Sequence, residues 1–594
     1  MGRMRRMLLR GTAVALSAAV LAAGALASCS MGGDPGRGMQ GAGDEDQDAG
    51  PGENPGGGSG ENTDDDSGVD MTEAAPGVDI TDCPYLRIEN RYGTTYVVSG
   101  IYENELPDDG SIVIPDGVGL GQTWCDLYDE SDKPLGRSLE ASDVNSISLP
   151  AKLWMDDNIT KLEGWNTGSW VDVNNRNCID IIYRGNLADW CTYLDLSRDT
   201  KFFYTVRSIK IGKQEADLKD LKKITAENLA DAKRIGGYAF YKCSGLTSVE
   251  IPDGVAYIGD YAFYECSGLT SVEIPDSVWE IGDYAFYKCS GLTSVEIPDR
   301  VGEIGDYAFY ECSGLTSVII GNGVWEIGDY AFYRCSELTS VTIGNSVTEI
   351  GVWAFSYCSG LTSVEIPDRV GEIGENAFYY CSELTSVKIG NVVTKIGDQA
   401  FLGCSGLTSV EIPDSVTEIG DYAFRYCRGL TSVKIGNGVT KIGTSAFSDC
   451  EGLTEVEIPD SVTEIGGSAF YKCSGLTSVI IGNGVLEIGE AAFSWCRGLT
   501  SVEIPDSVTK IGKEAFYGCS GLASVTIGKG VTEIGSRAFY SFNLSSVIFG
   551  DPNDWYRIDI NGNLNETPVD IDNANPRKNA SIIGSSSDVY FVRK

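Results

Sequence analysis

A cysteine recurs every 23 residues in this chain, from Cys243 to Cys519, without a single insertion or deletion. Thirteen cysteines and fourteen phenylalanines, Phe240 to Phe539, keep this period. A fixed period of roughly 20 to 50 residues is typical of solenoids, in which each unit buries its apolar face only against its neighbours. The period therefore predicts a repeat solenoid and directs the search for function to exposed surfaces.

The order of residues within one unit predicts its local structure. Val295 and Ile297 alternate with polar residues, which is typical of a short strand with one buried face. Proline cannot donate to a strand ladder, so Pro298 ends this strand, and residues 301–304 form a second extended piece. Asp306 is placed to cap one helical turn over residues 307–311. We expect mainly short parallel β-strands, with one short helical turn per 23-residue coil.

The repeated phrase A-F-x-x-C-x-x-L-x-x-V-x-I-P-x-x-V-x-x-I-G resembles the BspA-like, or treponemal-type, leucine-rich repeat. The resemblance covers residues 236–550 in fourteen units, with weaker echoes at residues 112–118 and 146–150. It implies a leucine-rich-repeat solenoid in a bacterial surface or secreted protein. Members of the family are associated with adhesion to host matrix proteins and with contact between cells.

The remainder of the chain predicts export and a membrane anchor. A basic leader and a short apolar run end in Leu26-Ala-Ser-Cys29, which resembles the lipobox of bacterial lipoproteins, with lipidation of Cys29; an ordinary signal peptide is the alternative. Along the chain we expect a lipoprotein signal peptide (1–28), a disordered acidic Gly-rich tether (29–79), an N-terminal module with degenerate repeats (80–205), a lead-in (206–235), the solenoid (236–550) and a C-terminal cap or tail (551–594).

Composition removes several classes of function. The formal net charge of −40 argues against nucleic-acid binding, which needs clustered Lys and Arg. The chain has no histidine, which removes Ser-His-Asp and Cys-His catalysis and HExxH zinc sites. We expect no catalytic, cofactor-binding or metal-binding residue.

The periodic cysteines have three interpretations: buried structural thiols, disulfides between adjacent coils, and metal or redox chemistry. Thirteen thiols cannot pair completely, and no CxxC motif occurs, so we expect them to act as small apolar residues of the core. Four further cysteines, Cys83, Cys125, Cys178 and Cys191, allow three pairings. We expect at least one disulfide among them, with Cys178 and Cys191 the nearest in sequence.

The exposed position between the two buried residues of each first strand is the most informative surface site. Units with Ile-Pro-Asp carry glutamate there, and units with Ile-Gly carry lysine or a neutral residue. After Ile366 the two types of unit alternate, which predicts a ladder of opposite charges in that part of the array. The units near residue 273 all carry glutamate, which predicts a stack of like charges there. The candidate binding face is Glu250, Glu273, Glu296, Glu365, Lys388, Glu411, Lys434, Glu457 and Glu503. Duplication of a 46-residue unit, with its solvated face carried along, is the alternative origin of this pattern.

Aromatic residues recur at other partly exposed positions, where we expect packing between coils rather than contact with a partner. They are Tyr261, Tyr284, Tyr307, Tyr330, Tyr422, Trp279, Trp325 and Trp353.

These observations favour a non-enzymatic cell-surface adhesion or recognition protein that is lipid-anchored at Cys29 to the bacterial cell envelope, in the outer membrane or on the cell surface. Its partner would be a protein or glycan of a host or neighbouring cell. A structural envelope component without a specific ligand is the second hypothesis, and an enzyme within residues 80–205 is the third.

Overall fold

A computed structural model of the chain describes residues 216–541, 543–559, 564–565, 567–584 and 589–593, together with shorter segments upstream. Those segments are residues 86–91, 95–102, 111–113, 118–120, 126–128, 134–138, 146–149, 179–183, 186–193 and 206–211. The predicted signal peptide, the lipidation site Cys29 and the predicted tether lie outside the described residues. Within the described part of the chain, no helix has the length and apolar character needed to cross a membrane.

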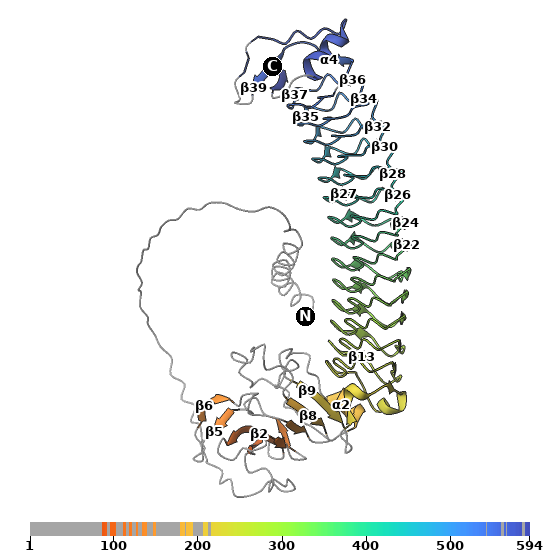
Figure 1. Cartoon of the computed structure of the whole chain (residues 1–594), viewed down its shortest axis with the longest axis vertical. Coiled ribbons are helices and arrows are strands. Elements are labelled where there is room, and N and C mark those ends of the chain that lie inside the picture. Colours follow the sequence, from red (N-terminus) through yellow and green to blue (C-terminus); the bar gives the residue numbers. More distant parts are fainter. Residues whose placement is uncertain are drawn as a thin grey trace, which may run out of the picture. The chain divides into compact units, whose positions relative to one another are not determined.

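The repeats form stacked coils, each with two short strands, so the predicted solenoid of mainly parallel β-structure is confirmed (Figure 1). Strands at the same position in successive coils pair in parallel and in register, as in Val295 with Val318 and Ile281 with Ile304. Two ladders of strands therefore run along the array; the second belongs to one continuous sheet, whereas the first is divided into sheets of three, nine and three strands. A solenoid of this kind exposes long surfaces with one copy of each position per coil.

The first ladder consists of β11 (Lys223–Ile224), β12 (Ser248–Glu250), β14 (Ser271–Glu273), β16 (Ser294–Ile297), β18 (Ser317–Ile320), β20 (Ser340–Thr342), β22 (Ser363–Glu365), β24 (Ser386–Lys388), β26 (Ser409–Ile412), β28 (Ser432–Ile435), β30 (Glu455–Ile458), β32 (Ser478–Ile481), β34 (Ser501–Ile504), β36 (Ser524–Ile527) and β38 (Ser546–Phe549). The second consists of β13 (Tyr257–Ile258), β15 (Glu280–Ile281), β17 (Glu303–Ile304), β19 (Glu326–Ile327), β21 (Glu349–Ile350), β23 (Glu372–Ile373), β25 (Lys395–Ile396), β27 (Glu418–Ile419), β29 (Lys441–Ile442), β31 (Glu464–Ile465), β33 (Glu487–Ile488), β35 (Lys510–Ile511) and β37 (Glu533–Ile534).

The core is built from columns of identical side chains. The fourteen phenylalanines are fully buried, and each ring stacks on the ring of the next coil, with centroids 5.1–5.4 Å apart. From Cys266 to Cys519 each thiol donates a hydrogen bond to the phenylalanine carbonyl of the preceding coil, as from Cys312 to Phe286 at 3.1 Å. The thirteen cysteines are free and buried, which confirms their predicted packing role.

The segment expected to form a helical turn forms a different structure. Tyr307 and Glu311 have left-handed φ angles of 58° and 53°, and backbone N–H groups alternate between two kinds of partner. Ala308 donates to Gly305 of its own coil, whereas Phe309 donates to Ala331 of the next coil. Every second N–H therefore points along the stack, and the left-handed residues 307 and 311 interrupt a helical backbone, so no α-helix forms here.

Asp306 does not cap its own turn, so its predicted role was wrong. Its carboxylate instead accepts the backbone N–H of Asp329, at the same position in the next coil, at 2.7 Å. Threonines form a second ladder of this kind, as when the Thr316 hydroxyl donates to the Thr293 carbonyl at 2.9 Å. These side chains satisfy polar groups between coils and hold adjacent coils in register.

The described strands upstream of the array form two sheets. The first contains β1 (Leu86–Arg91), β2 (Thr95–Tyr102), β4 (Val118–Leu120), β5 (Asp126–Tyr128) and β6 (Pro134–Ser138). The second contains β3 (Ser111–Val113), β7 (Ser146–Leu149), β8 (Ile179–Tyr183), β9 (Val206–Ile211) and β10 (Ala216–Asp217). The two echoes of the repeat lie on β3 and β7, which pair in parallel, as strands of successive coils do.

Buried tryptophans lie at both ends of the array. Trp190, on α2 (Leu187–Tyr193), donates its indole N–H to the Ala239 carbonyl at 2.8 Å. Two short 3-10 helices, η3 (Leu218–Asp220) and η4 (Ala226–Leu229), precede the first full coil. At the other end, β40 (Val589–Arg593) pairs antiparallel with β37 and with β39 (Trp555–Asp559), beside α4 (Pro576–Gly584). This pairing covers the open edge of the second ladder, which would otherwise invite association with other strands.

Cys191 contradicts the expectation of a disulfide at this position. It is a free, buried thiol, and its carbonyl accepts the Gly236 N–H at 2.8 Å. A pairing through Cys191 is therefore wrong, because this residue packs on the first coil. Cys83, Cys125 and Cys178 lie outside the described residues.

Candidate functional site

The nine residues of the predicted binding face occupy one position of the first ladder, between the two inward-facing residues of each strand. Eight of them are exposed, and Glu250 is half-buried. Val295 and Ile297 show why: both are buried, so Glu296 between them points to the opposite side of the strand. The face thus lies along the first ladder as expected, one residue per coil.

The charges on this face form separate pairs rather than the continuous ladder that the sequence predicted. Lys388 forms an ion pair with Glu365, and Lys434 forms one with Glu411. Lys434 also lies in register with Glu457, but the structure shows no ion pair between them. The hydrogen bond from each lysine to its glutamate raises the lysine pKa. Exposed pairs of this kind contribute little to stability, so the pattern of charge matters mainly for recognition.

The expected stack of like charges is also interrupted at its start. Glu250 lies in register with Glu273, but its carboxylate forms an ion pair with Lys223 at 2.7 Å. The hydrogen bond from Lys223, followed by that from the Ala226 N–H, lowers the pKa of Glu250. Lys223 was not predicted to belong to this face, because it precedes the first complete repeat.

A hollow of about 1300 Å³ lies on the candidate face. Glu296 and Glu365, three coils apart, border it, and Ile319 and Thr342 line it between them. Ile319 is 48% exposed, and Ile480 and Ile548, at the same repeat position, are 58% and 43% exposed. The hollow therefore combines an apolar contact with flanking carboxylates on the face that the sequence had indicated.

The hollow coincides with a break in the repeat pattern. Residues 320–322 and 343–345 are two consecutive Ile-Gly-Asn units, whereas the Ile-Gly units that begin at residues 389, 435 and 481 each lie between two Ile-Pro-Asp units. A Cβ added to Gly321 would lie 2.6 Å from the Asp299 nitrogen, and one on Gly344 would lie 2.1 Å from the Gly321 oxygen. These glycines pack directly on the preceding coils. The break in alternation was the sequence signal that could have located the hollow.

Two arginines complete the rim. Arg300 and Arg369, both exposed, stand on the Pro-Asp-Arg turns at the two ends of the hollow. Neither guanidinium forms an ion pair within the described part of the chain, and the same holds for the Glu296 carboxylate. Unpaired charges of both signs beside an apolar residue are suited to orienting a partner. Neither arginine was predicted from the sequence to belong to this face.

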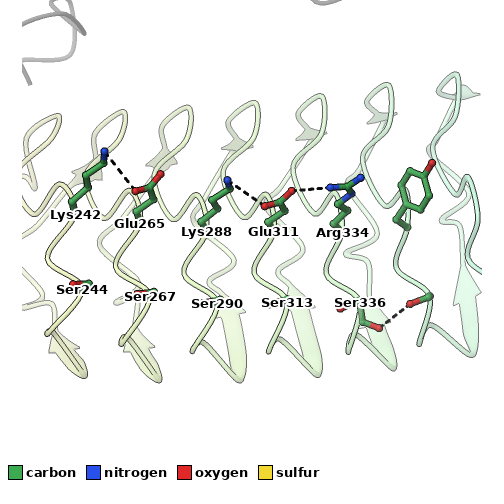
Figure 2. A pocket seen from close by; sticks show the side chains of 12 residues that line it. Lys242, Ser244, Glu265, Ser267, Lys288, Ser290, Glu311, Ser313, Arg334 and Ser336 are labelled. Atoms are coloured by element: carbon green, nitrogen blue, oxygen red, sulfur yellow. Dashed lines mark hydrogen bonds and ion pairs between the residues drawn. The ribbon is translucent and has the colours of Figure 1, made fainter. Parts of the chain in front are cut away.

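A second groove, of about 1020 Å³, follows the turns that precede the cysteines (Figure 2). Lys242, Glu265, Lys288, Glu311 and Arg334 alternate in sign along it, above a row of serines. Lys288 and Arg334 lie 3.4 and 3.2 Å from the Glu311 carboxylate. Because the charges compensate one another, this groove presents little net charge. The alternation of charge along it was not predicted from the sequence.

Most of the periodic aromatics pack between coils, as expected. Tyr261, Tyr284, Tyr307 and Tyr330 form a column with ring centroids 4.6 Å apart, and Trp353 stacks on Tyr330 at 5.9 Å. Tyr422 is half-buried against the Arg425 guanidinium. Trp279 and Trp325 differ, because they are 48% and 41% exposed.

Two further observations concern metal ligands and thiols among the described residues. Within these residues no group of three or more Cys, Asp or Glu side chains is arranged to hold a metal ion. Burial raises the pKa of Cys404 and Cys519 to about 12, so these thiols are poor nucleophiles.

The chain is similar in part to several solved leucine-rich repeat proteins. The chain is 35% identical to a leucine-rich repeat protein from Bacteroides ovatus, over 53% of this chain and 82% of that one, with a TM-score of 0.49. It is 31% identical to a leucine rich cell surface protein from Faecalibacterium prausnitzii, over 52% and 88% of the two chains, with a TM-score of 0.32. A leucine-rich repeat protein of T. pallidum is also 31% identical, over 29% and 81%, with a TM-score of 0.26. No curated protein sequence matches.

The family model of the BspA type leucine rich repeat region matches residues 233–362, 325–454 and 440–559, in six copies. Together these matches cover more than half of the chain and the whole of the cysteine-bearing array. The chain therefore belongs to the family of proteins with BspA-type leucine-rich repeats.

Proposed function

We propose that this protein is an exported, lipid-anchored, non-enzymatic binding protein of the bacterial cell surface. Its repeat array would recognise a protein or glycan of a host or neighbouring cell. Proteins of this repeat family are typically surface-exposed or secreted, and they are typically non-enzymatic. Anchoring through Cys29 would leave the array free to face outward on the predicted tether.

The hollow around Ile319 is the observation that most supports a binding role. Ile319 is exposed next to Glu296 and Arg300 of the preceding coil, and neither of these charged side chains forms an ion pair within the described part of the chain. Such an arrangement is useful when a partner covers the isoleucine and pairs with the charges. A purely structural coat would have no need of it.

Protease treatment of intact cells tests the proposed location. We expect added proteinase K to remove the array from intact cells, because the solenoid would stand outside the outer membrane. An antibody against the array would follow its loss, and a periplasmic protein would serve as the control for membrane integrity. If the array stays intact until the cells are permeabilised, the proposed surface role is wrong and the hypothesis of a structural envelope component is favoured.

Substitution of Cys29 by Ser provides the matched control for anchoring. The variant should still be exported but should appear in the soluble fraction, because it lacks the thiol that carries the lipid. Membrane association that persists in Cys29→Ser would contradict lipidation at this residue.

A further inference from the structure

Two exposed tryptophans occupy the same position of the repeat, two coils apart. Trp279 and Trp325 are 48% and 41% exposed, and Gly302 holds this position in the coil between them. Neither ring is needed to fill the core, whose columns run through other positions of each coil. Large aromatic groups left in water on a soluble protein usually mark a contact surface.

Backbone hydrogen bonds fix the spacing of the two rings. The Gly302 N–H donates to the Trp279 carbonyl at 2.9 Å, and the Trp325 N–H donates to the Gly302 carbonyl at 2.8 Å. Since adjacent parallel strands lie about 4.8 Å apart, the two attachment points are separated by about 10 Å. The tryptophans therefore stand on a rigid scaffold with a defined interval.

Both rings lie toward the preceding coil. The Trp279 ring centroid is 6.4 Å from that of Tyr257, and the Trp325 indole nitrogen lies 3.1 Å from the place where a Cβ of residue 302 would be. Any larger residue at position 302 would thus displace the Trp325 ring. Glycine at this position leaves the space that the Trp325 indole occupies.

Polar groups flank the row of rings on both sides. Glu280 and Glu303, half-buried on the second ladder, lie in register beside the tryptophans. Arg300 is exposed on the coil between them, two residues before Gly302, and forms no ion pair with any described residue. The carboxylates can accept hydrogen bonds from hydroxyl groups of a ligand that lies on the aromatic faces, and the guanidinium can donate hydrogen bonds to such hydroxyl groups.

We propose that Trp279 and Trp325 form a binding site for a neutral, extended β-linked polysaccharide. The apolar C–H face of a pyranose ring stacks on an indole, while its equatorial hydroxyls point sideways to the flanking polar groups. Each sugar of an extended β-linked chain adds a length close to the distance between adjacent coils. In such a chain alternate sugars present the same face, so two rings two coils apart would stack on equivalent faces.

A protein partner fits this surface less well. Its apolar side chains would need a contiguous patch, whereas here the aromatic rings are separated by Gly302 and bordered by charged residues. Of the residues named for the hollow around Ile319, this site shares only Arg300, so substitutions of the tryptophans and of Ile319 test the two proposals separately.

Titration of the full chain with cellohexaose, followed by tryptophan fluorescence and calorimetry, tests the site. We expect saturable binding, which Trp279→Ala and Trp325→Ala each weaken by about tenfold and which the double substitution abolishes. Leu486→Ala is the matched control, because Leu486 occupies the same repeat position and is 52% exposed but lies outside the pair. This variant should bind like the unaltered chain.

Substitutions of Gly302 and Gly371 provide a second matched pair of variants. Residues 299–305 and 368–374 have the same sequence, Asp-Arg-Val-Gly-Glu-Ile-Gly. Gly302 lies under Trp325, whereas a Cβ on Gly371 would meet nothing within 4 Å. Gly302→Leu should therefore weaken cellohexaose binding by about tenfold or more, and Gly371→Leu should leave it unchanged.

Three results would overturn the proposal. They are the absence of cellohexaose binding, binding that survives in the Trp279→Ala/Trp325→Ala variant, and equal affinity for α-linked maltohexaose, whose chain is curved rather than extended. Ile319→Asp should retain cellohexaose binding, which separates this site from the one proposed for adhesion.

Discussion

Replacing Phe355 with Ala is expected to lower the free energy of unfolding by about 3 to 5 kcal/mol. The Phe355 ring is fully buried and stacks between Phe332 and Phe378, with centroids 5.2 and 5.4 Å away. Its removal opens a cavity that the short coils cannot close, because the backbone on both sides is fixed by inter-coil hydrogen bonds. In a solenoid this loss weakens the interfaces with both neighbouring coils.

Urea denaturation followed by circular dichroism measures the effect. Because each coil contacts only its neighbours, the Phe355→Ala array should unfold at lower urea and over a broader range, as its two halves become less coupled. Ile480→Ala is the control, since Ile480 is 58% exposed and its truncation should change stability by less than about 0.5 kcal/mol. An unchanged transition in Phe355→Ala would contradict the role of the phenylalanine column.

The array cysteines are expected to resist thiol reagents in the folded protein by several orders of magnitude. The thiolate is the reactive form, and burial raises the pKa of Cys404 and Cys519 to about 12. At about pH 8 only about one such thiol in ten thousand is ionised, against about a quarter of ordinary cysteines. A raised pKa lowers the thiolate fraction at every pH below it, so labelling should increase as pH approaches 12 or when the coils open.

Mass-tagging with a maleimide, with and without guanidinium chloride, tests this expectation. Cys191 and the thirteen array cysteines should gain mass only in denaturant, because burial also raises the pKa of Cys191. Peptides containing Cys83, Cys125 or Cys178 provide the internal comparison. Rapid labelling of several array cysteines in the native protein would mean that the coils are far less closed than the structure shows.

The sequence predicted the solenoid, its two buried columns and its exposed strand position because each depends on periodicity alone. Any side chain that returns every 23 residues in register must stack on its own copy, so Phe355 and Cys358 were readily assigned to the core. The local conformation of the turns was not predicted correctly. The turn over residues 307–311 has the composition of a helix, but its alternate N–H groups bond to the next coil, and only the stack supplies those partners.

The candidate site was predicted in position but not in shape. The strand face carrying Glu296 and Glu365 was expected, whereas the hollow between them arises from two consecutive Ile-Gly-Asn units. The close packing of Gly321 on Asp299 depends on three-dimensional contacts between coils, which no single unit contains. The ion pair of Glu250 with Lys223 was missed for a similar reason, since Lys223 lies before the periodic region.

The central claim is that the strand face around Ile319 binds a partner on another cell. The most direct test compares two matched variants, Ile319→Asp in the hollow and Ile480→Asp at the same repeat position outside it, both strongly exposed in the structure. Binding of each full chain to a solubilised basement-membrane matrix is measured by surface plasmon resonance. We expect saturable binding by the unaltered chain and by Ile480→Asp, and binding weakened by about tenfold or more in Ile319→Asp. Absence of saturable binding, or equal affinities for the two variants, would contradict the claim.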